Sequence, residues 1–350
     1  MTETAGMREI AKTLQALAGI VGISGGEGDV ARAILALAAP HADETRMDAL
    51  GNLIVRRRGP GPRVMLSARM DTVGLLVTHV DAAGFARVAP VGALPLSHAL
   101  GHVFALAGGR RGVLAHEGKT APKDVAWEHC YLDFGAGDRA GSARVGDRAA
   151  FAAESFVANG RIISPGLSGR AGCAVLLQVL ARPQPPACDV SFVFTAQGVL
   201  GARGARTAAY ALAPAWAVSV GVSEAGDTPE SAHKNDVTLG GGGALRVMDD
   251  TLITPAPLLR ILEDTARAHQ IPLQRAVPPQ GGSDAGAVLI SRSGVPASAV
   301  DIPVRYMHTA AEMAGLCDLV SCAALITALP LAFSSSENGE NRGNDLTRRL

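Results

Sequence analysis

Residues 192–205 read FVFTAQGVLGARGA, and they connect a predicted strand to a predicted helix. The run DVSFVFTA is rich in β-branched and aromatic residues, whereas ARGARTAAYALA begins a helical pattern. In open α/β sheets, loops at the C-terminal ends of strands carry the chemistry of the protein. Yet Gly198, Val199 and Leu200 in this loop offer no acid, base, nucleophile or metal ligand. The loop therefore lies where a site is expected but has no reactive side chain in its middle.

The bulk composition narrows the class of protein. The chain has 350 residues, 48% of them hydrophobic, which is enough for one large or two medium domains. Its 32 basic and 32 acidic residues balance, which gives no electrostatic argument for binding nucleic acid or a membrane surface. No apolar run approaches the roughly 20 residues that span a bilayer, and the opening MTETAGMREIAKTL lacks the apolar core of a signal peptide. We therefore expect a cytoplasmic protein without nucleic-acid or membrane partners.

The chain divides into two kinds of sequence. Helical and strand-like patterns alternate in residues 1–72 and again in 162–333, which predicts an α/β sheet with helices on both faces. Residues 73–161 instead contain short strand-like runs, such as VGLLVTHV and HVFALAG, separated by turns. This pattern predicts a small β-rich domain inserted into an α/β domain. The polar tail, residues 334–350, is expected to be disordered.

Seven phrases of the sequence occur together in one known family. They are GISGGEGDV, DALGNLIV, SARMDTVGLLV, FVFTAQGVLGARGA, AGDTPE, GGSDAGAV and IPVRYMHTAAEM. In order and spacing they resemble the TET-type dinuclear-zinc aminopeptidases, which include glutamyl and deblocking aminopeptidases and cellulase-M-like proteins (family-42 metallopeptidases). The resemblance covers roughly residues 7–333. It implies a zinc-peptidase-like mixed sheet flanked by helices, an inserted barrel- or PDZ-like dimerisation domain, and often tetrahedral dodecamers built from dimers.

The resemblance also implies a catalytic centre of two zinc or cobalt ions, and most of its ligand positions hold other residue types here. The first histidine of the family aligns with Arg69, its bridging aspartate with Ser168, and a further ligand aspartate with Ser219. The base glutamate and the ligand glutamate align with Gly198 and Val199. Four of the five expected ligands and the general base are therefore absent, so no metal cofactor is expected.

Two groups of the pattern persist. His308 occupies the position of the last ligand, and Asp71 is the aspartate that accompanies the first histidine. A single histidine without further nitrogen, thiolate or carboxylate ligands is a poor zinc site, so a structural role is expected for His308. Asp71 and Asp284 are expected to cap turns or to pair with arginine. We also hypothesise that Arg69, beside Asp71 and Asp284, supplies fixed positive charge in place of the metal ions, unless it turns outward to solvent.

These substitutions predict a catalytically silent homologue of a dinuclear-zinc aminopeptidase. It would act as an assembly or regulatory subunit, in a homo-oligomer or with an intact paralogue, or it would bind a peptide or amino-acid-like ligand. The alternative is a hydrolase of peptides or small amides with metal-independent or single-metal chemistry. In that case His308 would be the base and Ser168 or Ser219 the nucleophile, and a hydrogen bond between either serine and His308 would favour it. The expected residual pocket comprises Arg69, Asp71, Ser168, Gly198, Val199, Ser219, Asp284 and His308.

A new metal site in the inserted domain is a further, weaker hypothesis. Its candidate ligands fall in three short groups: His98 with His102, His116 with Glu117, and Glu128, His129 with Cys130. The four-residue spacing of the first group would suit a metal on a helix, but no third ligand accompanies it. The five cysteines of the chain form no CxxC pair and are expected to be reduced thiols.

Overall fold

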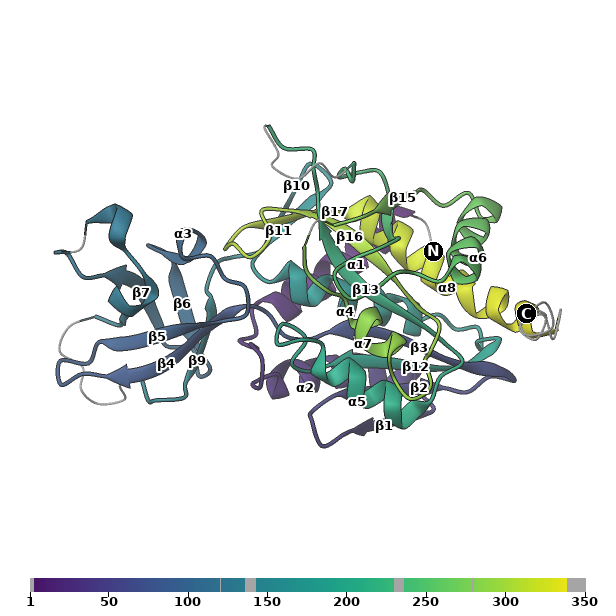
Figure 1. Ribbon diagram of the computed structural model, residues 1–350, viewed down its shortest axis with the longest axis horizontal. Helices are drawn as coiled ribbons and strands as arrows, with labels where there is room; N and C mark the ends of the chain where they lie inside the picture. Colours follow the sequence, from purple (N-terminus) through teal and green to yellow (C-terminus); the bar gives the residue numbers. More distant parts are fainter. Residues whose placement is uncertain (1–2, 120, 136–142, 230–235, 279, 339–350) are drawn as a thin grey trace.

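The computed structural model describes residues 3–119, 121–135, 143–229, 236–278 and 280–338. They form a large α/β domain and a smaller β-barrel that projects from one end of it (Figure 1). The barrel comes from one stretch in the middle of the chain, so segments before and after it build the α/β domain. The predicted mixed sheet with an inserted β-rich domain is confirmed.

The central sheet has 11 strands, and four neighbouring strands at its middle run parallel, in the order β12-β3-β13-β16. Their bounds are β3 Gly61–Arg69, β12 Cys188–Thr195, β13 Trp216–Glu224 and β16 Ala297–Arg305. The flanking strands are β1 Glu44–Met47, β2 Leu53–Arg57, β10 Phe156–Ala158, β11 Arg161–Ser164, β14 Gly243–Arg246, β15 Leu273–Ala276 and β17 Glu312–Gly315. Because parallel strands point the same way, the C-terminal ends of the middle four meet at one edge of the sheet.

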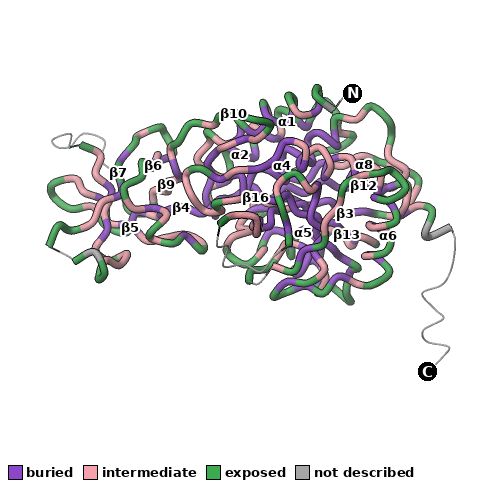
Figure 2. Tube along the Cα trace, turned by 90° about the horizontal axis from the view of Figure 1, so that it is seen from above, coloured by how far each residue is buried: buried purple, intermediate pink, exposed green. Residues whose placement is uncertain are grey.

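Helices cover both faces of this sheet, as Figure 2 shows by the buried strands at its centre. Helices α1, α2, α4, α6 and α8 share one apolar core, and α5 and α7 share the other. Their bounds are α1 Glu3–Ala18, α2 Gly28–Ala38, α4 Leu167–Leu180, α5 Arg203–Leu212, α6 Ala256–Ala268, α7 Asp284–Leu289 and α8 Leu316–Asn338. Helix α4 lies between the sheet and the outer helices, so every one of its 14 residues is buried.

Helix α8 corrects two expectations. It continues to Asn338, so residues 334–338 are helical rather than part of a disordered tail, and 339–350 lie outside the described residues. Its segment Leu316–Ser335 is 20 residues long with a mean hydropathy of 2.0, so an apolar run of membrane-spanning length does exist. More than half of that segment is buried inside the protein, against the sheet and α4. The run is therefore apolar because α8 is a core helix.

The inserted domain is a closed antiparallel barrel, with strands in the order β4-β5-β8-β7-β6-β9. These strands are β4 Gly74–Val80, β5 Ala86–Val91, β6 Val103–Leu106, β7 Arg111–His116, β8 Cys130–Asp133 and β9 Arg148–Phe151, with the short helix α3 Leu96–Ala99. Alternate residues point into an apolar core of its own, which includes Leu75, Phe104 and Leu132. The barrel ends at Phe151 rather than near residue 161, because β10 pairs with β11 in the main sheet.

Close packing of α4 on the sheet depends on Gly172. A Cβ atom at this position would lie 2.1 Å from the carbonyl oxygen of Val220 in β13. Replacing Gly172 by alanine is therefore expected to lower the free energy of unfolding by about 1–3 kcal/mol, because neither backbone has room to move. Gly19 is the matched control, since a Cβ atom there meets nothing within 4 Å. Urea unfolding of both variants measures the difference, and equal losses would contradict this account.

Candidate functional site

A cleft of about 660 Å³ opens at the C-terminal edge of the parallel strands. Its floor is formed by the ends of β3, β13 and β16, and its walls by the loop after β12, the start of α7 and the segment after β16. Among the expected pocket residues it brings together Arg69, Gly198, Val199, Ser219, Asp284 and His308. Asp71 lies behind this surface and accepts a backbone N–H of the loop after β12. Ser168 lines a neighbouring small cavity instead, where its own backbone N–H donates to the carboxylate of Glu312.

Asp71 is fully buried and holds the loop that follows β12. One carboxylate oxygen accepts a hydrogen bond from the backbone N–H of Gly198, and the other accepts one from Val199, each at 2.9 Å. The hydroxyl of Ser24 also donates to this carboxylate. Both oxygens of Asp71 are therefore occupied by the protein itself, and the carboxylate acts as the anchor of the loop.

Two further side chains, which the sequence analysis did not single out, fix the same loop. The carboxylate of Glu27 accepts the backbone N–H of Gln197 at 2.8 Å, and the side-chain oxygen of Asn52 accepts that of Ala196 at 2.8 Å. The amide of Asn52 donates in turn to the carbonyl of Gly204, at the start of α5. Glu27 and Asn52 belong to the phrases GISGGEGDV and DALGNLIV, so the phrases carry a structural signal that was available from the sequence.

Gly198 and Val199, at the positions where the resemblance implies two glutamates, are used for packing. A Cβ atom at Gly198 would lie 2.9 Å from Cβ of Arg69 and 2.8 Å from a carboxylate oxygen of Asp71, so the absence of a side chain makes room for Arg69. The side chain of Val199 packs against the barrel core and approaches Gly92. The loop without reactive groups therefore joins the site to the inserted domain.

Arg69 is the last residue of β3 and lines the cleft. Its Nε donates a hydrogen bond to the carbonyl of Ser168 at 2.8 Å, while the side chain lines the cleft. The positive charge of Arg69 opposes the rise in pKa that burial causes at Asp284 and at Asp301. Arg69 is thus held by a backbone carbonyl and acts on several carboxyl groups at once, rather than forming a single close ion pair with Asp71 or Asp284.

Asp284 begins α7 and accepts a hydrogen bond at 2.8 Å from the hydroxyl of Thr195, the residue that pairs with Arg69 across β12 and β3. Part of its surface remains open to the cleft, but protein atoms surround the carboxyl closely. This desolvation raises the pKa of Asp284 to about 6, against the opposing effects of Thr195 and Arg69. The carboxyl therefore changes its charge just below neutral pH.

His308 lies on the opposite wall in a left-handed backbone conformation, with φ of 63°. Its backbone N–H donates to Glu312 at 2.7 Å, and the other oxygen of Glu312 accepts the N–H of Ser168 at 2.7 Å. Burial and the nearby charge of Arg69 lower the pKa of His308 to about 4, so the ring is neutral at pH 7. Its Nε2 is buried and has no hydrogen-bond partner among the described residues.

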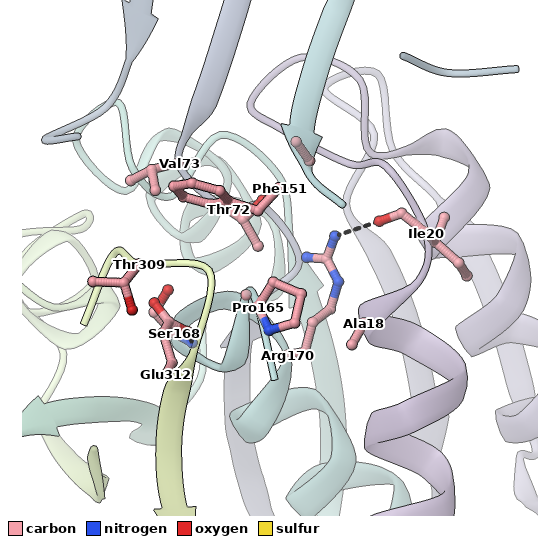
Figure 3. A pocket seen from close by; sticks show the side chains of 12 residues that line it. Ala18, Ile20, Thr72, Val73, Phe151, Pro165, Ser168, Arg170, Thr309 and Glu312 are labelled. Carbon is pink, nitrogen blue, oxygen red and sulfur yellow. Dashed lines mark hydrogen bonds between the residues drawn. The ribbon is translucent and has the colours of Figure 1, made fainter. Parts of the chain in front are cut away.

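Figure 3 shows the neighbouring small cavity at the junction with the barrel, where Ser168 and Glu312 lie on one side and Arg170 on the other. Arg170 is only 1% exposed. Its guanidinium donates to the carbonyls of Ile20 and Gly22, and burial lowers its pKa. Arg170 therefore fixes the segment before α2, and this segment holds Ser24 next to Asp71.

Sequence reasoning missed a buried ionic cluster on the cleft floor. Arg246 in β14 donates twice to the same oxygen of Asp301 in β16, and its third nitrogen donates to Asp249 at 3.0 Å. The second oxygen of Asp301 is buried without a partner among the described residues. No motif marked these residues, because a carboxylate in the run PASAVDI acquires its neighbours only through strand pairing.

The donor set of the cleft does not fit a pair of metal dications. Arg69 carries a permanent positive charge and cannot coordinate zinc. Both oxygens of Asp71 are bound by backbone and serine donors, and Asp284 is held by Thr195. His308 is therefore a single nitrogen donor, and the carboxylates that line the same cleft, Asp284 and Asp301, are already held by Thr195 and Arg246.

The serine–histidine arrangement that would favour the hydrolase alternative is not formed. Within the described part of the chain, neither Ser168 nor Ser219 hydrogen-bonds to His308, and the hydroxyl of Ser219 has no partner. The low pKa of His308 also makes it a weak base at neutral pH. The site therefore has no activated serine in this conformation.

Several candidate metal ligands of the barrel have other partners, whereas Nδ1 of His98 is buried without a hydrogen-bond partner among the described residues. The ring of His102 packs edge-on against Phe151, and a ring nitrogen of His129 accepts the N–H of Ala126. The carboxylate of Glu117 pairs with Arg87. These contacts are structural, and they stabilise turns of the barrel.

The fold and the position of the cleft define the protein as an α/β peptidase-type domain with an inserted barrel. A sequence profile of the M42 glutamyl aminopeptidases matches residues 51–325, and the chain belongs to this family. It is 31% identical to a lysyl aminopeptidase of Pyrococcus furiosus, over 82% of this chain and 87% of that protein.

Solved structures agree with this assignment. An aminopeptidase of the archaeon Desulfurococcus kamchatkensis superimposes with a TM-score of 0.88 at 29% identity, covering 96% of this chain and 98% of that one. A PhTET1 structure described as a dodecamer gives a TM-score of 0.81 at 28% identity, covering 91% and 98% of the two chains. The family resemblance inferred from the seven phrases is therefore confirmed, while the loss of the metal ligands stays a prediction.

The contact between Gly198 and Arg69 predicts energetic coupling. Gly198→Ala is expected to lower the free energy of unfolding by about 1–3 kcal/mol in the wild-type background, because the methyl group collides with the base of the Arg69 side chain. The loss should be smaller by at least about 0.5 kcal/mol in an Arg69→Gly background, where both Arg69 contacts are gone. A double-mutant cycle by chemical denaturation measures the coupling, and strict additivity would show that the two positions are independent.

The raised pKa of Asp284 predicts a specific pH dependence. Because the folded protein binds this proton more tightly than the unfolded chain, the stabilisation from the protonated carboxyl is complete below about pH 4 and is lost as the pH rises through 6. Asp284→Asn should therefore be more stable than wild type above pH 6, by at most about 3 kcal/mol. The difference should shrink as the pH falls to 4. Thermal unfolding across this range tests the sign, and a less stable variant at pH 7 would contradict it.

Proposed function

We propose that this chain is a catalytically silent homologue of the M42 aminopeptidases that retains the cleft as a ligand-binding site. The observation that carries the proposal is Arg69, a fixed cation at the position where the resemblance implies the first metal ligand. The donor set around it supports the proposal, because Asp71 and Asp284 are already bound within the protein. Placing two metal dications beside the positive charge of Arg69 would cost free energy through electrostatic repulsion.

The arrangement of the loop after β12 supports the same conclusion. A base next to the attacking water is required for two-metal peptide hydrolysis, and Gly198 and Val199 stand at the two glutamate positions. Their present contacts, with Arg69 and with the barrel core, use the space that longer acidic side chains would need. Restoring activity would therefore require several simultaneous changes.

A silent homologue would act through binding or assembly. The PhTET1 relatives are described as a dodecamer and as a tetrahedron or large octahedral shell, which supports a homo-oligomer. The resemblance assigns the dimer contact in such an assembly to the inserted barrel. An intact paralogue in the same cell would offer a hetero-oligomer instead. The molar mass of the purified chain by light scattering, alone and after co-expression with such a paralogue, separates these forms.

The decisive experiment measures metal content and hydrolysis on the same preparation. The purified full-length chain is equilibrated with zinc or cobalt, desalted, analysed by mass spectrometry for bound metal, and assayed on aminoacyl nitroanilides. We expect less than one ion per chain and hydrolysis at least about 10⁴-fold slower than the lysyl aminopeptidase of Pyrococcus furiosus treated in parallel.

His308→Ala is the matched control for this experiment. If His308 is not a metal ligand, the variant should carry the same residual metal as the wild type. Two bound ions per chain that are lost in the variant, together with hydrolysis by the wild type, would overturn the proposed function.

A further inference from the structure

Arg69, Gly221 and Asp301, on the neighbouring strands β3, β13 and β16, form a row across the floor of the cleft. Gly221 in β13 pairs with Asp301 in β16, and Ser219, two residues earlier, pairs with Ser67 in β3. Arg69 lies two residues beyond Ser67, so continuing the same register beyond the last pair places it level with Gly221 on the other side. With about 4.8 Å between strands, the Cα atoms of Arg69 and Asp301 are about 10 Å apart. The strand between them carries no side chain at this level, which leaves an open slot.

One side of the slot presents an unpaired carboxylate oxygen. Both bonds from Arg246 go to Oδ2 of Asp301, whereas Oδ1 is buried and has no partner among the described residues. A Cβ atom at Gly221 would lie 2.8 Å from this Oδ1, so the oxygen leans over the bare backbone of β13. A buried acceptor of this kind is costly until it receives a donor, and an ammonium group is the strongest donor available to it.

The other side of the slot presents a cation. The Nε of Arg69 donates to the carbonyl of Ser168, and Arg69 is one of the residues that line the cleft. A guanidinium binds a carboxylate through two parallel hydrogen bonds. The hydroxyl of Ser219, buried and unpartnered among the described residues, adds a donor one level below the slot.

We propose that this slot binds the head group of a free amino acid, with the ligand carboxylate on Arg69 and the ligand ammonium on Oδ1 of Asp301. A purely anionic ligand would leave Asp301 unsatisfied, and a purely cationic ligand would face the charge of Arg69. Val73, Ile290 and Met307 line the same cleft and suit an apolar side chain. The inference rests on the proposed function, because it requires a cleft that holds no metal ions.

The test compares ligands that differ by one charge. The full-length chain is titrated calorimetrically with L-leucine, L-methionine and L-valine, and with two analogues of leucine: isocaproate, which lacks the amine, and isoamylamine, which lacks the carboxylate. We expect at least one of the three amino acids to bind, and each leucine analogue to bind at least about 10-fold more weakly than leucine. Absence of binding by all three amino acids, or equal binding of leucine and isocaproate, would overturn the proposal.

Two variants test the site itself. Gly221→Ala places a methyl group against Oδ1 of Asp301 and should weaken amino-acid binding at least about 10-fold, while Arg246 and Asp301 keep their ion pair. Arg69→Gln removes the cation and should have a similar effect, whereas Arg69→Lys should retain part of the affinity. Unfolding temperatures of all variants show that they fold. If Gly221→Ala bound the amino acid with wild-type affinity, the ligand would have to bind elsewhere and the proposal would be wrong.

The metal and hydrolysis measurements are made on the same samples, so the two failures can be told apart. A chain with two bound ions and peptidase activity would overturn the proposed function. If the chain has no bound metal and no peptidase activity, and also binds none of the three amino acids, only the amino-acid proposal is overturned.

Discussion

Charge balance at the C-terminal edge of the parallel strands governs how this site is built. Asp71, Asp301 and Glu312 are buried there, and Asp284 lies nearby. So many carboxyl groups in a small volume repel one another and lose hydration, unless cations and hydrogen-bond donors offset both effects. The charge of Arg69 acts on Asp284, Asp301 and Glu312, and Arg246 pairs directly with Asp301. Backbone N–H groups and hydroxyls supply the donors. The two arginines therefore offset the carboxyl charge of the site together.

The path of the loop after β12 is fixed through its backbone and does not depend on the side chains that the loop carries. Glu27, Asn52 and Asp71 bind backbone groups of the loop after β12, so they hold its path whatever side chains it bears. Arg170 performs the same task for the segment before α2. A loop fixed through its peptide groups can exchange glutamates for glycine and valine without losing its shape. Membership of the family is therefore compatible with glycine and valine at positions 198 and 199.

The sequence predicted the fold well where local pattern and tertiary context agree. The run DVSFVFTA became β12, and the barrel was expected from its short strands and turns. The barrel boundary was misplaced because β10 looks like any other short strand, and only its pairing with β11 assigns it to the main sheet. The apolar length of α8 was underestimated because its periodicity is hidden in a helix that is apolar nearly all round.

The candidate site was predictable only in part. Residues such as Arg69, Ser219 and His308 could be placed in one cleft from the family phrases, and they do line it together. Asp301 and Arg246 could not be placed in the cleft from the sequence. They are far apart in the chain, and only the antiparallel pairing of β14 with β16 brings them together. The hydrogen bonds of Asp71 could not be predicted either, because their donors are mostly backbone N–H groups, which nearly every residue type has.

The barrel core extends to the edge of the cleft. Val73 belongs to that core and also lines the cleft, and Val199 packs against the same core from the loop after β12. Neither side chain can shift toward the cleft without disturbing the packing of the barrel, because protein interiors are close-packed. The two valines therefore serve the barrel and the cleft at once, so a change of side-chain volume at either position is felt both in the barrel core and at the wall of the cleft.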